Sequence, residues 1–164
     1  MADIPVYLVA GFLDAGKTNF INGILEDGFA RQDPTLLLCC EEGEEEYEKN
    51  ALDNVTVITI EDEEDLKCSY LKELEKEYHP KQVLIEYNGM WLLQDLANNL
   101  PENWIVYQCI ATADGTTALT YARDNSMRAL LLDKIARSEL IVFNRAEAVN
   151  ALKDYETNYK KKKA

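Results

Sequence analysis

Six short apolar runs are separated along the chain by segments in which hydrophobic residues recur every three or four positions. The apolar runs lack the alternation of polar and apolar positions that marks a half-exposed strand, and they cover residues 6–10, 35–40, 55–60, 83–86, 105–112 and 140–143. Continuous apolar runs of this length are typical of strands buried on both faces of a parallel sheet. We therefore expect six strands in one largely parallel sheet.

Helical periodicity fills the intervals between these runs. Residues 19–25 and 64–78 place their apolar side chains on one helical face, and the second segment ends before Pro80. Further helices are expected at residues 90–98, 117–136 and 146–163. Alternating strands and helices predict an α/β fold, a three-layer α/β/α sandwich around the sheet. Ligands of such folds bind beyond the carboxyl ends of the strands, so the residues that follow each strand are candidates for a site.

The turn after the first strand carries a complete phosphate-binding motif. Residues 11–18 read Gly-Phe-Leu-Asp-Ala-Gly-Lys-Thr, which matches G-x-x-x-x-G-K-[ST], the P-loop of nucleoside triphosphatases. Backbone N–H groups at the start of the following helix would cradle phosphate, and Lys17 would reach the β- and γ-phosphates. The Thr18 hydroxyl would bind Mg²⁺. The motif predicts a nucleotide site whose phosphate side consists of Gly11, Asp14, Ala15, Gly16, Lys17, Thr18 and Asn19.

The fourth strand ends in Glu86-Tyr87-Asn88-Gly89. A carboxylate at Glu86 would bind Mg²⁺ directly or through water, and Gly89 would let the backbone approach the γ-phosphate. The alternative is a strand that simply ends in a turn.

The sixth strand is followed by Asn144-Arg145-Ala146-Glu147, which has the form of the guanine-reading motif N-K-x-D with Arg for Lys and Glu for Asp. One carboxylate can accept hydrogen bonds from both N1 and N2 of guanine, an Asn amide can bond N7, and a long basic stem can cover the base. These residues favour GTP or GDP as the ligand. The alternative is that Asn144 only caps a helix.

Charge and composition narrow the classes of partner. The 164 residues, 47% of them hydrophobic, suit one domain that spans 1–164. A formal net charge of -13 disfavours nucleic acid. The sequence contains neither an apolar run of the ~20 residues that would cross a membrane nor a signal peptide, so we expect no membrane partner and a cytoplasmic location. The cysteines lack framework spacing and are expected to be reduced thiols: Cys39, Cys40, Cys68 and Cys109.

Six glutamates crowd residues 41–48 after the second strand. A solvated acidic loop, a switch that senses nucleotide and a site for a hard cation remain open as interpretations. Glu41 is a candidate for positioning the water that attacks GTP. Cys39 and Cys40 point to opposite faces of an extended strand and are expected to pack in the core, with Cys40 beside Glu41 as the only credible partial metal ligand.

The motifs at 11–18, 86–89 and 144–147 together resemble the CobW/HypB/UreG family of P-loop GTPases used in metal insertion, and most closely its CobW branch. The family pattern E-x-x-G falls on Glu86 and Gly89, and N-K-x-D falls on Asn144, Arg145 and Glu147. Residues 40–44 stand where CobW proteins carry an N-E-F-G-E switch segment. The resemblance implies Mg²⁺-dependent GTP binding with slow hydrolysis, in metal trafficking or metallocofactor assembly with a metalloprotein client.

Two departures from the family pattern qualify this expectation. CobW proteins usually carry a C-x-C-C metal motif after the third strand, whereas residues 57–64 here read Val-Ile-Thr-Ile-Glu-Asp-Glu-Glu, which argues against a transition-metal site. Family members also continue into another strand and commonly a C-terminal domain, so we expect a domain truncated at its C-terminus. Two other functions stay open: a P-loop kinase for a small acceptor, and a truncated or engineered scaffold that binds little nucleotide.

Overall fold

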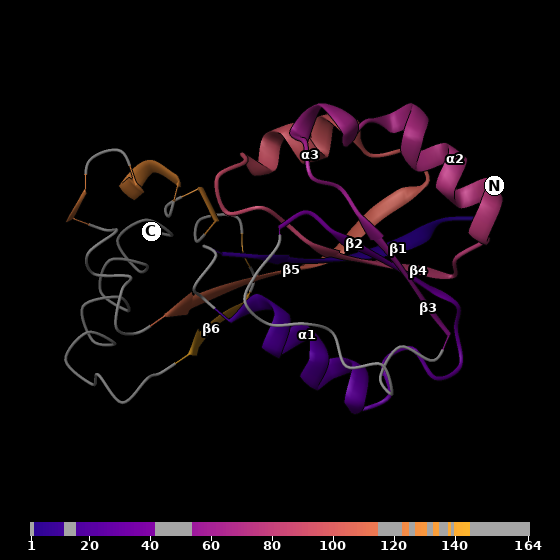
Figure 1. Cartoon of the computed structure of the whole chain (residues 1–164), viewed down its shortest axis with the longest axis horizontal. Coiled ribbons are helices and arrows are strands. Elements are labelled where there is room, and N and C mark those ends of the chain that lie inside the picture. Colours follow the sequence, from indigo (N-terminus) through magenta and orange to yellow (C-terminus); the bar gives the residue numbers. More distant parts are fainter. Residues whose placement is uncertain are drawn as a thin grey trace.

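A computed structural model of the chain describes residues 2–11, 16–41, 54–114, 123–124, 127–130, 133–134, 138 and 140–144. Within these residues, six strands form one sheet in the order β3-β2-β4-β1-β5-β6 (Figure 1). Every neighbouring pair is parallel. The strands are β1 (Ile4–Ala10), β2 (Thr35–Cys39), β3 (Val55–Thr59), β4 (Gln82–Glu86), β5 (Trp104–Asp114) and β6 (Leu140–Asn144). The six predicted strands are thus confirmed.

Helices cover both faces of the sheet (Figure 1). The helix α1 (Lys17–Glu26) lies on one face, and α2 (Cys68–Tyr78) and α3 (Leu93–Asn99) lie on the other. The predicted α/β/α sandwich is therefore confirmed. Residues 127–130 and 133–134 are helical, as expected for part of 117–136, while the helix expected at 146–163 lies outside the described residues.

One predicted helix was wrong at its start. Residues 64–78 were expected to form a continuous helix, but a short 3-10 turn, η2 (Glu63–Asp65), precedes α2, which begins at Cys68. Leu66 separates the two with φ -82° and ψ 81°, which is not helical backbone, and its side chain is buried. Burial of Leu66 explains why an apolar residue at helical spacing stands outside the helix.

The alternation of side chains along each strand divides the buried residues between two cores. Odd-numbered Val9 and Leu37 and even-numbered Leu84 pack on the α1 face with Ile21 and Leu25. Their sequence neighbours Leu8, Leu38 and Ile85 pack on the opposite face, together with residues of α2 and α3: Leu71, Leu74, Leu93 and Leu96. Because parallel strands place alternate side chains on opposite faces, each residue's position in its strand decides which core it enters.

The sheet order brings the carboxyl ends of β1, β2 and β4 together. Glu86 at the end of β4 is in register with Val9 of β1 on one side and with Cys39 of β2 on the other. The residues that follow these strands therefore meet at one edge, beside the start of α1.

Gly11 fixes how closely β1 approaches β5 at this edge. Its φ is +143°, and a Cβ atom built there would lie 2.5 Å from the carbonyl oxygen of Thr112. The first glycine of the motif is thus required by the packing of the sheet as well as by a turn.

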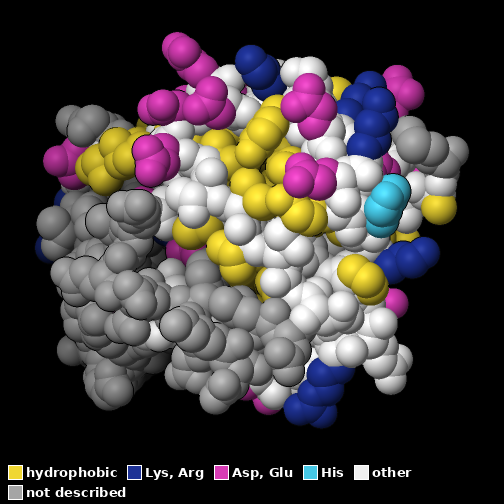
Figure 2. Space-filling model, turned by 45° about the vertical axis from the view of Figure 1, so that its right-hand side comes forward, with side chains coloured by type: hydrophobic (Ala, Val, Ile, Leu, Met, Phe, Trp, Pro, Cys, Tyr) yellow, Lys and Arg dark blue, Asp and Glu magenta, His cyan; other side chains and the backbone are white. Residues whose placement is uncertain are grey.

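The chain carries a formal net charge of -13. Asp and Glu side chains are scattered over the upper part of the face in Figure 2, around exposed hydrophobic side chains. Among the described residues, no helix is both long and apolar enough to cross a membrane.

Candidate functional site

The helix α1 begins inside the phosphate-binding motif. Gly16 caps its N-terminus in a left-handed conformation with φ 82°, and the Phe20 N–H donates to the Gly16 carbonyl at 3.0 Å. Lys17 and Thr18 occupy the first turn and are buried, at 2% and 7% exposure. Asn19 lies on the exposed side of the same turn. Asp14 and Ala15, expected to cradle phosphate, lie outside the described residues.

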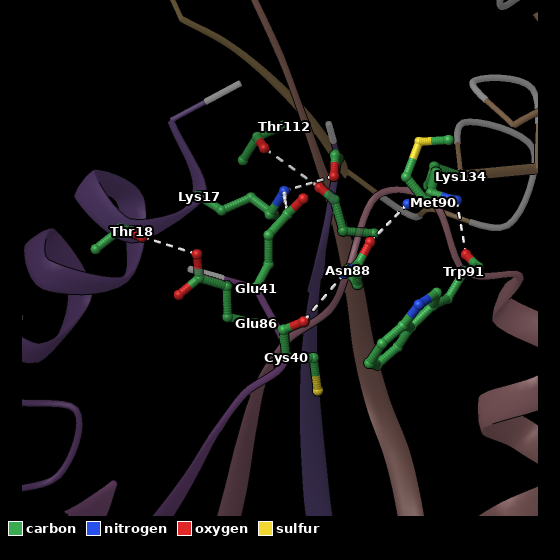
Figure 3. Close-up of polar contacts among 12 residues, drawn as sticks. Lys17, Thr18, Cys40, Glu41, Glu86, Asn88, Met90, Trp91, Thr112 and Lys134 are labelled. Atoms are coloured by element: carbon green, nitrogen blue, oxygen red, sulfur yellow. Dashed lines mark hydrogen bonds and ion pairs between the residues drawn. The ribbon is translucent and has the colours of Figure 1, made fainter. Parts of the chain in front are cut away.

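The Lys17 ammonium is held by two oxygen acceptors (Figure 3). Its Nζ donates to the carbonyl oxygen of Gly11 at 2.6 Å and forms an ion pair with Glu41 Oε2. The ion pair is largely shielded from water, since the Glu41 side chain is only 10% exposed. The structure thus brings three of the predicted site residues into contact.

Thr18 contacts the acid at the end of β4. Its hydroxyl donates to Glu86 Oε1 at 2.7 Å, and Glu86 is 2% exposed. Burial raises the pKa of Glu86, and the nearby Glu41 carboxylate raises it further, whereas the Thr18 hydrogen bond and Lys17 act in the opposite direction. A hydroxyl and a carboxylate side by side are oxygen donors of the kind that Mg²⁺ binds together with phosphate oxygens and water. These two residues therefore fit such an ion.

The neighbouring thiols point to opposite faces of the sheet, as expected. Cys39 lies on the Glu86 side of the sheet, with Sγ 3.3 Å from the Glu41 carbonyl oxygen and 3.8 Å from Glu86 Oε2. Cys40 is buried in the core beneath α2 and α3, where burial raises the pKa of its thiol. The predicted core packing of Cys40 is therefore confirmed, and the alternative of a partial metal ligand is not supported, because strand alternation turns Cys40 away from Glu41 and Glu86.

Asn88 fastens the loop after β4 to the end of β2. Its Nδ2 donates to the Cys40 carbonyl oxygen at 3.2 Å, and its Oδ1 accepts from the Met90 N–H at 2.9 Å (Figure 3). The turn buries Gly89, the predicted neighbour of the γ-phosphate. An Asn before Gly at the end of a strand is a known turn signal, but the motif pattern alone assigned no role to Asn88.

Asp133 and Lys134 hold the far end of this loop. Lys134 Nζ donates to the Trp91 carbonyl oxygen at 2.8 Å, and Asp133 Oδ2 accepts from the Leu93 N–H at 3.1 Å. Lys134 is 1% exposed, and burial is the main cause that lowers its pKa. No motif pointed to these residues, although a lysine within the apolar stretch 129–135 was an available signal.

A model of the CobW/HypB/UreG nucleotide-binding domain matches residues 5–164. The chain belongs to the CobW/HypB/UreG family. A comparison with curated proteins finds no significant match.

The family's base-reading motif follows the last strand of the sheet. Asn144 ends β6 and is in register with Asp114 at the end of β5, at the same edge of the sheet as Glu86. The side chain of Asn144, and all of Arg145 and Glu147, lie outside the described residues. Their roles in this CobW-family chain stay predictions.

The segment in which CobW proteins usually carry cysteines borders a separate cavity. The cavity has a volume of about 620 Å³ and contains none of the predicted site residues; it is lined by Thr59, Ile60, Glu61, Asp62, Asp65, Lys67, Ser69, Tyr70 and Glu73. Among the residues that the structure describes, no three His, Cys, Asp or Glu side chains are grouped to hold a metal ion.

Proposed function

We propose that this chain is a Mg²⁺-dependent GTP-binding domain that hydrolyses GTP slowly. The observation that carries the proposal is the 2.7 Å contact between Thr18 and Glu86 beside the buried Lys17. It supports the proposal because a P-loop lysine, a P-loop hydroxyl and an acid from a neighbouring strand are the side chains that a nucleotide with Mg²⁺ requires.

Catalysis by these residues would consist of positioning and charge stabilisation. The backbone from Asp14 to Thr18 cradles the phosphates, and Lys17 neutralises the charge that develops toward the leaving group. Thr18 and Glu86 hold Mg²⁺ directly or through water. The bound ion would neutralise the charge of the phosphate oxygens.

The residues after β2 and β4 act on the terminal phosphate in this proposal. The backbone at Gly89 approaches the γ-phosphate, and Glu41 positions the attacking water. Both residues follow strands that end at the same edge of the sheet as the P-loop.

Guanine is selected by the segment after β6. Asn144 bonds the base, Glu147 accepts from N1 and N2, and the Arg145 stem covers the ring. Gly11, Ala15, Gly16 and Asn19 complete the phosphate side. Glu147→Ala is then expected to weaken GTP and GDP binding and to leave ATP binding unchanged.

We further propose a cytoplasmic role in metal trafficking or metallocofactor assembly, with a metalloprotein client. Family membership supports this role, because the matching domain family is the CobW/HypB/UreG nucleotide-binding domain.

Calorimetric titration with GDP, GTP and ATP, with and without Mg²⁺, tests the proposal. We expect GTP and GDP to bind more tightly than ATP, Mg²⁺ to strengthen binding, and Lys17→Ala to abolish it. Equal binding of guanine and adenine nucleotides would instead favour a P-loop kinase. Absence of binding, or binding that survives Lys17→Ala, would overturn the proposal.

A further inference from the structure

The ion pair between Lys17 and Glu41 occupies the group on which phosphate binding depends. Lys17 is 2% exposed, and its ammonium contacts the Gly11 carbonyl and the Glu41 carboxylate (Figure 3). In a P-loop this ammonium is the group that reaches the β- and γ-phosphates. A carboxylate oxygen and a phosphate oxygen are equivalent acceptors for it, because both are anionic and both form charge-assisted hydrogen bonds.

Glu41 and a nucleotide cannot both hold Lys17 at low cost. A di- or triphosphate beside a carboxylate that is only 10% exposed would bring like charges together where water screens them little. Glu86, also buried, would add to this repulsion. The rearrangement with the lowest cost in free energy moves the Glu41 side chain away from Lys17.

The backbone around Glu41 allows this movement without disturbing the sheet. The backbone of Cys40 is hydrogen-bonded on both sides, since its N–H donates to the Glu86 carbonyl at 2.9 Å and its own carbonyl accepts from Asn88 Nδ2 at 3.2 Å. Glu41 follows directly. Its backbone oxygen contacts Cys39 Sγ at 3.3 Å, which is a weak bond to a thiol.

We propose that the Glu41 carboxylate competes with the phosphates of the nucleotide for the Lys17 ammonium. It holds Lys17 in the nucleotide-free chain, and a nucleoside di- or triphosphate expels it from that position. The position of Glu41, at the carboxyl end of β2, thereby depends on whether nucleotide occupies the site. The inference rests on the proposed function for the identity of the ligand, and it explains how Glu41 becomes available to position water only after GTP has bound.

The test compares nucleotide affinity in the wild-type chain and in Glu41→Gln, with GDP, ATP and a non-hydrolysable GTP analogue in the presence of Mg²⁺. Glu61→Gln is the matched control, because it removes the same charge from an exposed side chain after β3. We expect Glu41→Gln to bind roughly 5- to 150-fold more tightly, the usual range of coupling between two sites. Glu61→Gln should stay within about twofold of the wild type.

A second variant covers the case in which Glu41→Gln fails to fold. Glu41→Asp keeps the charge but is one methylene shorter, so it should reach Lys17 less well and give an affinity between those of the wild type and Glu41→Gln. Unchanged or weaker nucleotide binding in the folded variants would overturn the inference and leave the proposed function standing. Absence of binding in all of them overturns both. Tighter binding by Glu41→Gln together with equal affinities for the GTP analogue and ATP would support the competitor and overturn guanine selection alone.

Discussion

The Thr18 hydroxyl donates a 2.7 Å hydrogen bond to Glu86 Oε1, which joins residues 68 positions apart in the sequence. Thr18 belongs to the first turn of α1 and Glu86 ends β4, so the contact exists only when the helix, β1 and β4 are all in place. It is a contact of the folded chain and, in our proposal, the pair that receives Mg²⁺.

Replacement of Thr18 tests the Mg²⁺ role directly. Thr18→Ala removes the hydroxyl, so the gain in GDP affinity that Mg²⁺ provides should fall by about tenfold, or about 1.4 kcal/mol. Thr18→Ser keeps the hydroxyl and should retain the gain. Titration of GDP with and without Mg²⁺ measures both. An equal gain in Thr18→Ala and Thr18→Ser would show that the hydroxyl is not a ligand.

The buried carboxyl of Glu86 predicts how stability depends on pH. Its pKa in the folded chain is raised above the usual 4.5, so the folded state holds the proton more tightly than the unfolded state does. Between these two pKa values the free energy of unfolding should fall as pH rises. In Glu86→Gln this fall should be absent, and at neutral pH the nucleotide-free variant should be more stable than the wild type.

Urea denaturation from about pH 4 to about pH 8 measures this difference. Glu61→Gln provides the control for loss of one carboxylate. Identical pH profiles for the wild type and Glu86→Gln would contradict the expectation. The same variant should lose the Mg²⁺-dependent part of nucleotide binding, so a gain in stability would accompany a loss of function.

Two glycines offer a matched pair with opposite outcomes. Gly11→Ala places a Cβ 2.5 Å from the backbone oxygen of Thr112 at a φ of +143°, and it should destabilise the fold by about 1–3 kcal/mol. Gly23→Ala in α1 meets nothing within 4 Å and should stabilise it by about 0.5–1 kcal/mol. Thermal unfolding of both variants tests the pair, and a neutral Gly11→Ala would contradict the close approach.

Removal of the Lys134 ammonium should loosen the loop after β4. Lys134→Met deprives the Trp91 carbonyl of its donor and Asp133 of its neighbouring cation, at a cost of about 1–3 kcal/mol. Lys72→Met, on the exposed side of α2, should change the stability by no more than about 0.5 kcal/mol. Denaturation followed by tryptophan fluorescence compares the two variants. If Lys134→Met proves as stable as Lys72→Met, the hydrogen bond to Trp91 contributes nothing to the fold.

The strands β2 and β4 were predictable because they are buried on both faces and therefore read as continuous apolar runs. The edge strand β3 reads as an apolar run although it is partly exposed. The P-loop was predictable because its residues are consecutive. The contact of Lys17 with Glu41 was not, since β1 and β2 are separated by β4, and that order is a property of the whole sheet. The same reason hid the contact of Cys39 with Glu86, because it depends on β2 lying beside β4.

The register of β4 has a consequence for variation in this chain. Val83, Ile85 and Tyr87 enter the core beneath α2 and α3, and Glu86 therefore emerges beside Thr18. A slip of one residue would turn Tyr87 toward Thr18 and send the carboxylate into the hydrophobic core. Substitutions in the apolar residues of β4 that weaken the register are thus able to disable the site while no motif residue changes. Selection for a well-packed β4 and selection for a correctly aimed Glu86 act on the same residues.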